Sequence, residues 1–165
     1  MLSADTFRSV IGRFSSGVTI VTAVDDAGTD HGMTATAFAS VSLVPPLVLV
    51  CVDSAATMHG VLERATHFAV GFLAAGQEEL SRRFGSGEAH RGGIHEPERF
   101  EGVGYTRGVG GVAILNDVLA HIECRVHDRH VAGDHMIVVG EVDSAVAHDE
   151  SPLLYYRGGY RQLGG

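Results

Sequence analysis

The sequence lacks tryptophan altogether and has only two cysteines and four prolines among its 165 residues. It also lacks any run of about 18 uncharged apolar residues, and its first residues lack the apolar centre of a signal peptide. We therefore expect a cytoplasmic protein without a membrane-spanning helix. Cys51 and Cys124 both lie in apolar, strand-like runs and are expected to stay free thiols, with a disulfide between them as the less favoured alternative.

Basic side chains are scarce. The chain has 12 Lys and Arg against 20 Asp and Glu, which gives a formal charge of -8. Most of the surface therefore repels nucleic acid and anionic membranes, and an anionic ligand needs a local basic or amide-lined pocket. The length predicts a single domain over residues 1–165. With 45% apolar residues and 22 glycines, that domain is expected to be a compact, turn-rich β structure.

Short helices are predicted where good helix formers occur or apolar residues repeat at helical spacing, over residues 7–14, 58–65 and 77–84. For the first helix, Ser3 or Asp5 is the expected N-cap and Gly17 the expected end. For the second helix, Ser54 or Thr57 is the expected N-cap.

Strands are predicted in β-branched or alternating segments at residues 18–24, 47–52, 68–73, 135–142 and 153–163, with two more that begin at residues 31 and 119. Turns at residues 25–28 and 132–134 predict antiparallel hairpins. Pro45 and Pro46 cannot donate ladder hydrogen bonds and belong to a connection or a strand entry.

The apolar run at residues 47–52 is expected to be fully buried, and residues 85–98 are expected to form an exposed loop of variable conformation. Together these elements predict a mainly β domain with short helices, arranged as a sandwich or a closed β-barrel.

Hydroxyl groups are unusually dense in one strand-like stretch, at Thr34, Thr36, Ser40 and Ser42. Each buried hydroxyl needs a hydrogen-bond partner or costs about 1–3 kcal/mol. One interpretation is a pocket for a flat heteroaromatic ligand, whose anionic tail would be held by residues 81–83. The alternative is a polar strand face in water, next to a solvated helix on which the arginines at 82 and 83 pair with the glutamates at 78 and 79.

Ten histidines invite a metal hypothesis. His121, Cys124, His127 and His130 are spaced by three, an offset that puts neighbours on opposite faces of a strand, so no metal site is expected. A G-x-S-x-G nucleophile turn is absent. The glycines between 102 and 108 lack the strand and helix context of a dinucleotide-binding fold.

Several segments stand in order along nearly the whole chain: FRSVIGRFSSGVTIVTA, HGMTATAFASVSLVPPLVLVCV, FAVGFLA, QEELSRRF, GDH at 133–135 and PLLYYRGGY. Together they resemble the flavin reductase-like family, the small NAD(P)H:flavin oxidoreductases that supply reduced flavin to two-component monooxygenases.

The resemblance implies a split β-barrel homodimer of Greek-key, FMN-binding type. It implies FMN or FAD near the dimer interface, NADH (or NADPH) as co-substrate, hydride transfer from nicotinamide to flavin, and a separate flavin-dependent monooxygenase as partner. The main alternative is a non-catalytic, flavin-binding or electron-shuttling protein of the same barrel class. A second alternative is a split barrel that resembles pyridoxamine-phosphate oxidases or haem-handling proteins, but those lack the pairing of GMTATAF with GDH.

The resemblance also implies which residues form the site. The isoalloxazine and ribityl chain would be lined by Thr34, Ala35, Thr36, Ala37, Phe38, Ser40 and Val41. The ribityl or phosphate end would be approached by Asp53, Ser54, Ala55 and Thr57, and the phosphate side by Ser81, Arg82, Arg83 and Phe84. His135 would be the catalytic residue beside the nicotinamide, with Tyr160 as a second candidate there.

One position departs from the family pattern. Many relatives have asparagine where this chain has Gly71, so any side-chain hydrogen bond of that asparagine is missing here. The departure bears on the choice between FMN and FAD, which the sequence leaves open. No basic cluster for a 2′-phosphate is evident, which favours NADH over NADPH.

Overall fold

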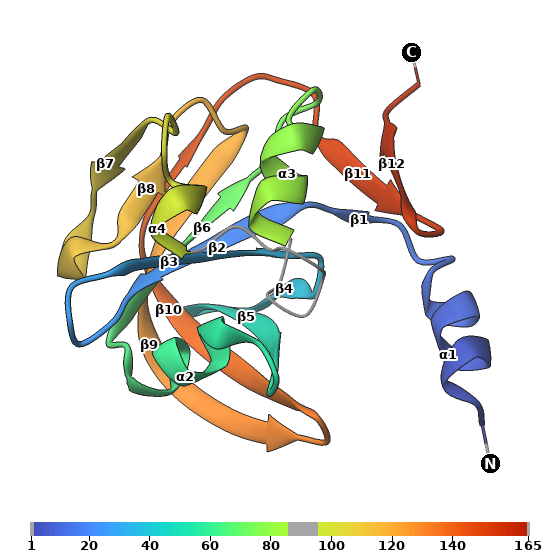
Figure 1. Ribbon diagram of the computed structural model, residues 1–165, viewed down its shortest axis with the longest axis horizontal. Coiled ribbons are helices and arrows are strands. Elements are labelled where there is room, and N and C mark those ends of the chain that lie inside the picture. Colours follow the sequence, from blue (N-terminus) through green and yellow to red (C-terminus); the bar gives the residue numbers. More distant parts are fainter. Residues whose placement is uncertain (1, 86–95, 165) are drawn as a thin grey trace.

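The computed structural model describes residues 2–85 and 96–164, and antiparallel strands make up about half of this part (Figure 1). Seven of them form the main sheet, in the order β3-β2-β6-β9-β10-β5-β4. Their bounds are β2 Thr19–Val24, β3 Asp30–Ala35, β4 Phe38–Leu43, β5 Pro46–Asp53, β6 His67–Phe72, β9 Ala120–Ala132 and β10 His135–Ala147. The predicted mainly β fold is confirmed.

Two small sheets and several short helices complete the described part. One sheet has the order β1-β11-β12, and the other pairs β7 with β8. The bounds are β1 Ser16–Gly17, β7 Tyr105–Arg107, β8 Ala113–Leu115, β11 Leu153–Tyr156, β12 Gly159–Gln162, α1 Ala4–Ile11, α2 Thr57–Arg64, α3 Glu78–Gly85, α4 Glu96–Arg99 and the 3-10 helix η1 Val109–Gly111. In Figure 1, α1 lies beside β1 and β12, apart from the main sheet.

The main sheet is open within the described residues, because its edge strands β3 and β4 do not pair with each other. The predicted closed barrel is therefore not confirmed. Only Thr36 and Ala37 separate the two edges along the chain. Consecutive Cα atoms lie about 3.8 Å apart, so the end of β3 and the start of β4 are within roughly 11 Å of each other. The sheet must curl until its opposite edges meet at this corner.

The two predicted hairpin turns are confirmed. Gly28, with φ of 82°, lies in the turn between β2 and β3, and Gly133, with φ of 66°, lies in the turn between β9 and β10. Both glycines adopt the left-handed backbone that a tight turn requires. The strand predicted at 153–163 forms two strands, and the short strands β1, β7 and β8 were not predicted.

The curled sheet encloses one core and carries a second on its outer face. Inside, apolar residues of β5, β6 and β10 pack with α2, as Val50, Leu62 and Phe68 illustrate with 0% exposure each. Outside, α3, α4 and the segment after α4 cover β3 and β2, and Phe84 and Phe100 meet edge to face at 5.1 Å above Gly32. Alternate residues of the central strands are therefore buried on both faces.

The predicted helices are present, but several predicted ends are wrong. Ser3 caps α1 by accepting a hydrogen bond from the Thr6 N–H, as one of the two alternatives expected. The helix ends at Gly12 rather than Gly17. The N–H groups of Arg13 and Phe14 bond only three residues back, and the Gly12 carbonyl accepts from the Arg157 N–H instead of from a further helical turn. The N-cap of α2 is Ala56, without a side-chain hydrogen bond, so neither Ser54 nor Thr57 caps that helix.

The expectation that residues 47–52 of strand β5 are fully buried is wrong. Val48, Val50 and Val52 are buried, whereas the residues between them are half-buried. The strand turns only one face toward the inner core. Cys51 lies on the other face, and it and buried Cys124 are free thiols.

Of the loop expected at residues 85–98, residues 86–95 lie outside the described residues, and a short helix begins at Glu96. In the part of the chain that the structure describes, no helix is both long and apolar enough to cross a membrane.

Candidate functional site

A chain of hydrogen bonds joins β3, α3 and β12. The Thr34 hydroxyl donates to the Ser81 carbonyl oxygen at 2.6 Å, and the Ser81 hydroxyl shares a 2.8 Å hydrogen bond with the Tyr160 hydroxyl. Ser81 is completely buried, with 0% exposure, so this bond satisfies a hydroxyl that water cannot reach. The hydroxyl of Thr34, which the sequence suggested would face a ligand, is instead bonded within the protein.

The two adjacent arginines of α3 have different environments. The Arg82 guanidinium lies 4.8 Å from the centre of the Tyr160 ring and 3.6 Å from the Glu78 carboxylate. Its side chain is 68% exposed, so the ion pair is weak and the charge remains accessible. Arg83 instead donates to the carbonyl oxygens of Glu98 and Glu101, at 2.5 and 2.7 Å. Arg83 thus ties α3 to α4 and to the segment that follows it.

The corner between β3 and β4 presents polar groups to solvent. Thr36 and Ala37 are exposed, and the Ala37 carbonyl accepts from the Cys51 N–H at 3.1 Å. Phe38 is held by an edge-to-face contact with Phe72, at 5.0 Å between ring centres. Just before the corner, the Ala35 carbonyl accepts from the buried hydroxyl of Thr19 at 2.7 Å.

A bulge in β4 follows this corner. The pairing of β4 with β5 shifts between Ser40 and Ser42, which leaves Val41 as the extra residue, 51% exposed. Ser40 is also exposed. Bulges redirect side chains at the edge of a sheet. Here the bulge leaves a hydroxyl and an apolar side chain accessible beside the polar corner.

The glycine-aspartate-histidine turn lies against the end of β5. His135 pairs with Asp53 across the strands, and the Ser54 N–H donates to the Asp134 carbonyl oxygen at 2.9 Å. His135 Nδ1 lies 2.7 Å from Asp134 Oδ1, a hydrogen bond that lowers the pKa of the Asp134 carboxyl. The Asp53 carboxylate accepts from the Ala55 N–H at 2.8 Å. Hydrogen bonds thus connect the turn to the end of β5 and the segment that leads into α2.

The structure therefore brings the expected residues together in two groups. The first, the Ser81 group, contains Thr34, Ser81, Arg82 and Tyr160. The second, the His135 group, contains Asp53, Ser54, Asp134 and His135. Within the described ranges no hydrogen bond or ion pair connects the two groups. Tyr160, expected with His135 beside the nicotinamide, is bonded to Ser81 and belongs to the Ser81 group.

Two expected positions lie inside or near the outer core. Phe84 has 1% exposure, so its side chain packs against Phe100 and is shielded from solvent. Gly71 pairs with Ile20, which in turn pairs with Thr34, so these residues share one face of the sheet. A Cβ at Gly71 would lie 3.5 Å from a Val118 methyl group, an ordinary contact distance. An asparagine side chain at position 71 would thus point toward Val118.

Among residues 2–85 and 96–164, no group of three or more His, Cys, Asp and Glu side chains could hold a metal ion. Sequence reasoning did not single out a cavity at the junction of α1 and the β11–β12 turn, which three arginines line: Arg8, Arg13 and Arg157. A signal was present, because three of only 12 basic residues fall in the segments FRSVIGRF and YYRGGY.

Comparisons with known proteins agree over almost the whole chain. The sequence profile of the flavin reductase like domain matches residues 11–164. An NADH-dependent flavin reductase of a Rhodococcus species is 42% identical over 158 residues, 94% of this chain and 84% of that protein. The reductase subunit HsaB of a flavin-dependent monooxygenase from Rhodococcus jostii is 40% identical over 155 residues, 93% of this chain and 75% of that protein.

A solved structure agrees as well. The NADH:FAD oxidoreductase of Streptomyces globisporus, in complex with NAD and FAD fragments, superposes with a TM-score of 0.86 at 37% identity. The match covers 97% of this chain and 92% of that one.

The hydrogen bond between Ser81 and Tyr160 predicts a measurable loss of stability. Tyr160→Phe leaves the buried Ser81 hydroxyl without this partner, and we expect the free energy of unfolding in urea to fall by about 1–3 kcal/mol. Tyr156→Phe is the matched control, since no hydrogen bond of its hydroxyl occurs in the described part of the chain, and it should change stability by less than about 0.5 kcal/mol. Adding Ser81→Ala to Tyr160→Phe should cost less than the sum of the two single changes. Equal losses in the two phenylalanine variants would show that the hydrogen bond contributes nothing.

Proposed function

The chain belongs to the flavin reductase-like domain family, and we propose that it is an NAD(P)H:flavin oxidoreductase that passes a hydride from a reduced nicotinamide nucleotide to FMN or FAD. The reduced flavin would then be supplied to a separate flavin-dependent monooxygenase. The observation that carries the proposal is the Ser81 group, in which a hydroxyl chain and an accessible arginine lie together. The names of the relatives support both the reaction and the partner.

The described residues fit a phosphate-bearing flavin. The corner at Thr36 and Ala37 and the exposed Ser40 offer polar groups beside an apolar edge, as a ring with both polar and apolar atoms requires. Arg82 offers an accessible guanidinium for a phosphate, whereas the guanidinium of Arg83 is bonded to two backbone carbonyl groups. When bound, the flavin supplies the two-electron acceptor chemistry.

The protein's own part in the reaction is to bind and orient. Backbone amides of the segment from residue 34 to residue 41, directed at the pyrimidine edge of the flavin, would favour the negative charge that reduction creates. Residues 53–57 would approach the ribityl chain or its phosphate. His135 would orient the nicotinamide nucleotide, and its hydrogen bond with Asp134 would fix the ring for that task.

The quaternary structure and the finer fold belong to the same proposal. We propose a split β-barrel of Greek-key, FMN-binding type, a form supported by the curl that brings β3 and β4 together. We also propose a homodimer. Helix α1 has no buried residue, and Phe7, Val10 and Ile11 are 55%, 63% and 54% exposed. A helix of eight residues is too short to be stable alone in water, so an apolar face of this kind favours packing against a second copy.

The two free cysteines support a cytoplasmic location, where thiols stay reduced. NADH is the proposed donor, with NADPH as the alternative, because the relatives include an NADH-dependent flavin reductase.

The reaction itself is tested by following NADH absorbance with FMN or FAD as acceptor. We expect flavin-dependent oxidation of NADH, slower oxidation of NADPH, and a fall of roughly tenfold or more in kcat/KM for His135→Ala, because a poorly oriented donor loses transition-state stabilisation. His148→Ala, an exposed histidine outside both groups, is the control and should match the wild type. Flavin binding without NADH oxidation would instead identify the electron-carrying alternative, and unchanged kinetics in His135→Ala would remove the orienting role.

The division of labour between the two arginines is tested by titrating FMN into Arg82→Ala and Arg83→Ala at low and high salt. We expect Arg82→Ala to weaken FMN binding by about tenfold at low salt, with a smaller difference at high salt because ions screen the charge. Arg83→Ala should lower stability more than affinity, since it loses two carbonyl partners. Wild-type affinity in Arg82→Ala would exclude this residue from the phosphate site.

The homodimer is tested by light scattering after size-exclusion chromatography. We expect a mass of twice 17.4 kDa for the wild type. Val10→Lys on α1 should shift the equilibrium toward the monomer, because the substitution places a charge on the apolar face. Val109→Lys is the matched control, as Val109 is 55% exposed but lies on η1, away from α1. A wild-type monomer at all concentrations would overturn this part of the proposal.

A further inference from the structure

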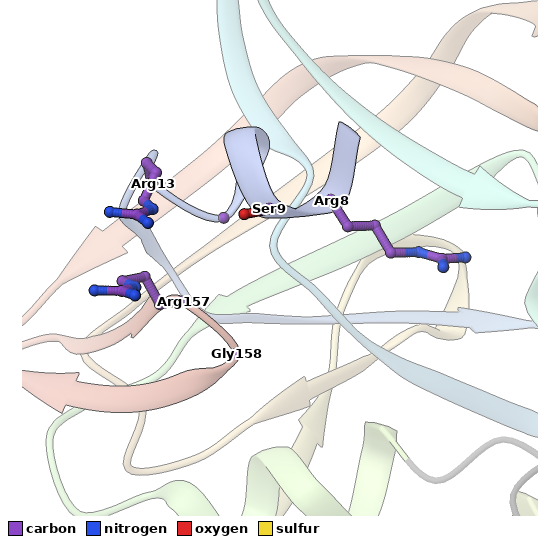
Figure 2. A pocket seen from close by; sticks show the side chains of 6 residues that line it. Arg8, Ser9, Arg13, Arg157 and Gly158 are labelled. Atoms are coloured by element: carbon purple, nitrogen blue, oxygen red, sulfur yellow. The ribbon is translucent and has the colours of Figure 1, made fainter. Parts of the chain in front are cut away.

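A cavity of about 300 Å³ lies where the end of α1 meets the turn between β11 and β12 (Figure 2). It is lined by Arg8, Ser9, Gly12, Arg13, Arg157 and Gly158. The Arg157 N–H donates to the Gly12 carbonyl oxygen at 2.9 Å, so a backbone hydrogen bond holds the helix end and the turn together. The cavity is thus built by two segments that are far apart in the sequence.

The charge on this cavity is unbalanced. Figure 2 shows the side chains of Arg13 and Arg157 pointing to the same side, whereas Arg8 points the other way, and its guanidinium lies 3.4 Å from Asp5. No carboxylate of the described chain lies within ion-pair distance of Arg13 or Arg157. The end of α1 contributes only about half a negative charge, so the two arginines leave an excess of roughly one and a half positive charges. The chain as a whole carries -8, which makes this a local reversal of sign.

The backbone conformation of Arg157 is a second, independent observation that points to a role for its side chain. Arg157 has φ of 51° and Gly158 has φ of 77°. Two successive residues with positive φ form the hairpin turn that asparagine and glycine adopt most easily. An arginine at the first of these positions is strained, and strain of this kind is retained where the side chain has a task.

A short piece of chain joins the cavity to Tyr160 of the Ser81 group. Tyr160, which bonds to Ser81 and stacks on Arg82, follows Arg157 by three residues at the start of β12. Three residues of chain span at most roughly 11 Å, and the turn makes the distance shorter. A ligand whose first phosphate lay at Arg82 could therefore extend a second charged group toward this cavity.

We propose that Arg13 and Arg157 bind a phosphate group of an adenine dinucleotide, with the Ser9 hydroxyl as a further donor. Planar guanidinium groups suit phosphate oxygens, and the cavity volume is at the lower end of known ligand sites, enough for a phosphate and part of a sugar. This site is separate from the one proposed for the phosphate of FMN. The dinucleotide is FAD or the nicotinamide nucleotide, so the assignment rests on the proposed function.

The direct test is calorimetric titration of the whole protein with ADP at low and at near-physiological salt. We expect the wild type to bind ADP and Arg13→Ala and Arg157→Gly each to bind it about tenfold more weakly. Glycine adopts a positive φ without strain, so Arg157→Gly removes the charge and keeps the turn. Arg64→Ala is the matched control, an exposed arginine on α2 that pairs with Asp26 at 2.9 Å, and it should bind ADP like the wild type.

Two further measurements identify the source of the phosphate. If the ligand is FAD, Arg157→Gly weakens FAD binding and leaves FMN binding unchanged, since FMN has no adenylate. If it is the nicotinamide nucleotide, Arg157→Gly raises the KM for NADH with FMN as the acceptor.

The outcomes for the site and for the proposed function are distinguishable. Three results would each overturn the proposed site. The wild type does not bind ADP, or the wild type and both cavity variants bind ADP equally, or Arg64→Ala loses as much affinity as the cavity variants. ADP binding that depends on Arg157, in a protein that does not oxidise NADH with any flavin, would support the site and refute the proposed function.

Discussion

The two residues between β3 and β4 impose the central constraint on this molecule. Strands β3 and β4 are the opposite edges of the seven-stranded sheet, yet only Thr36 and Ala37 lie between them in the chain. Because so short a connection cannot span a flat sheet, the sheet must curl. The curl encloses the inner core around Phe68 and places the polar corner beside the bulge of β4. The geometry of the candidate flavin site thus follows from the length of one connection.

Ser81 links that corner to the rest of the structure. It is completely buried, its carbonyl accepts from Thr34, and its hydroxyl is bonded to Tyr160. A buried hydroxyl must be paired, so the positions of β3, α3 and β12 relative to one another are coupled through this residue. The guanidinium of Arg82 lies over the Tyr160 ring, and Arg157, which lines the cavity at the end of α1, precedes Tyr160 by three residues.

The accuracy of the sequence-based expectations depended on how local each feature was. The turns at Gly28 and Gly133 and the helix that contains Ser81 were predicted correctly, and Ser3 was one of the two caps expected for α1, because each feature depends on a few neighbouring residues. Caps and ends were wrong where a following segment decided them, as at Gly17, where the helix had already ended five residues earlier. The run at 47–52 was expected to be fully buried, but only alternate residues of β5 are buried. Apolar content alone does not reveal whether a second layer covers the other face of the strand.

The sequence by itself determined the class of the fold, the order of its hairpins, the family resemblance and the residues available for a site. These follow from periodicity, turn chemistry and ordered motifs, which are properties of neighbouring positions. Only the tertiary structure decided which side chains are free to act. Thr34 and Arg83 are bonded to carbonyl groups of distant segments, whereas Arg82, Arg13 and Arg157 remain accessible. Such pairings join residues far apart in the chain, and no pattern of adjacent residues encodes them.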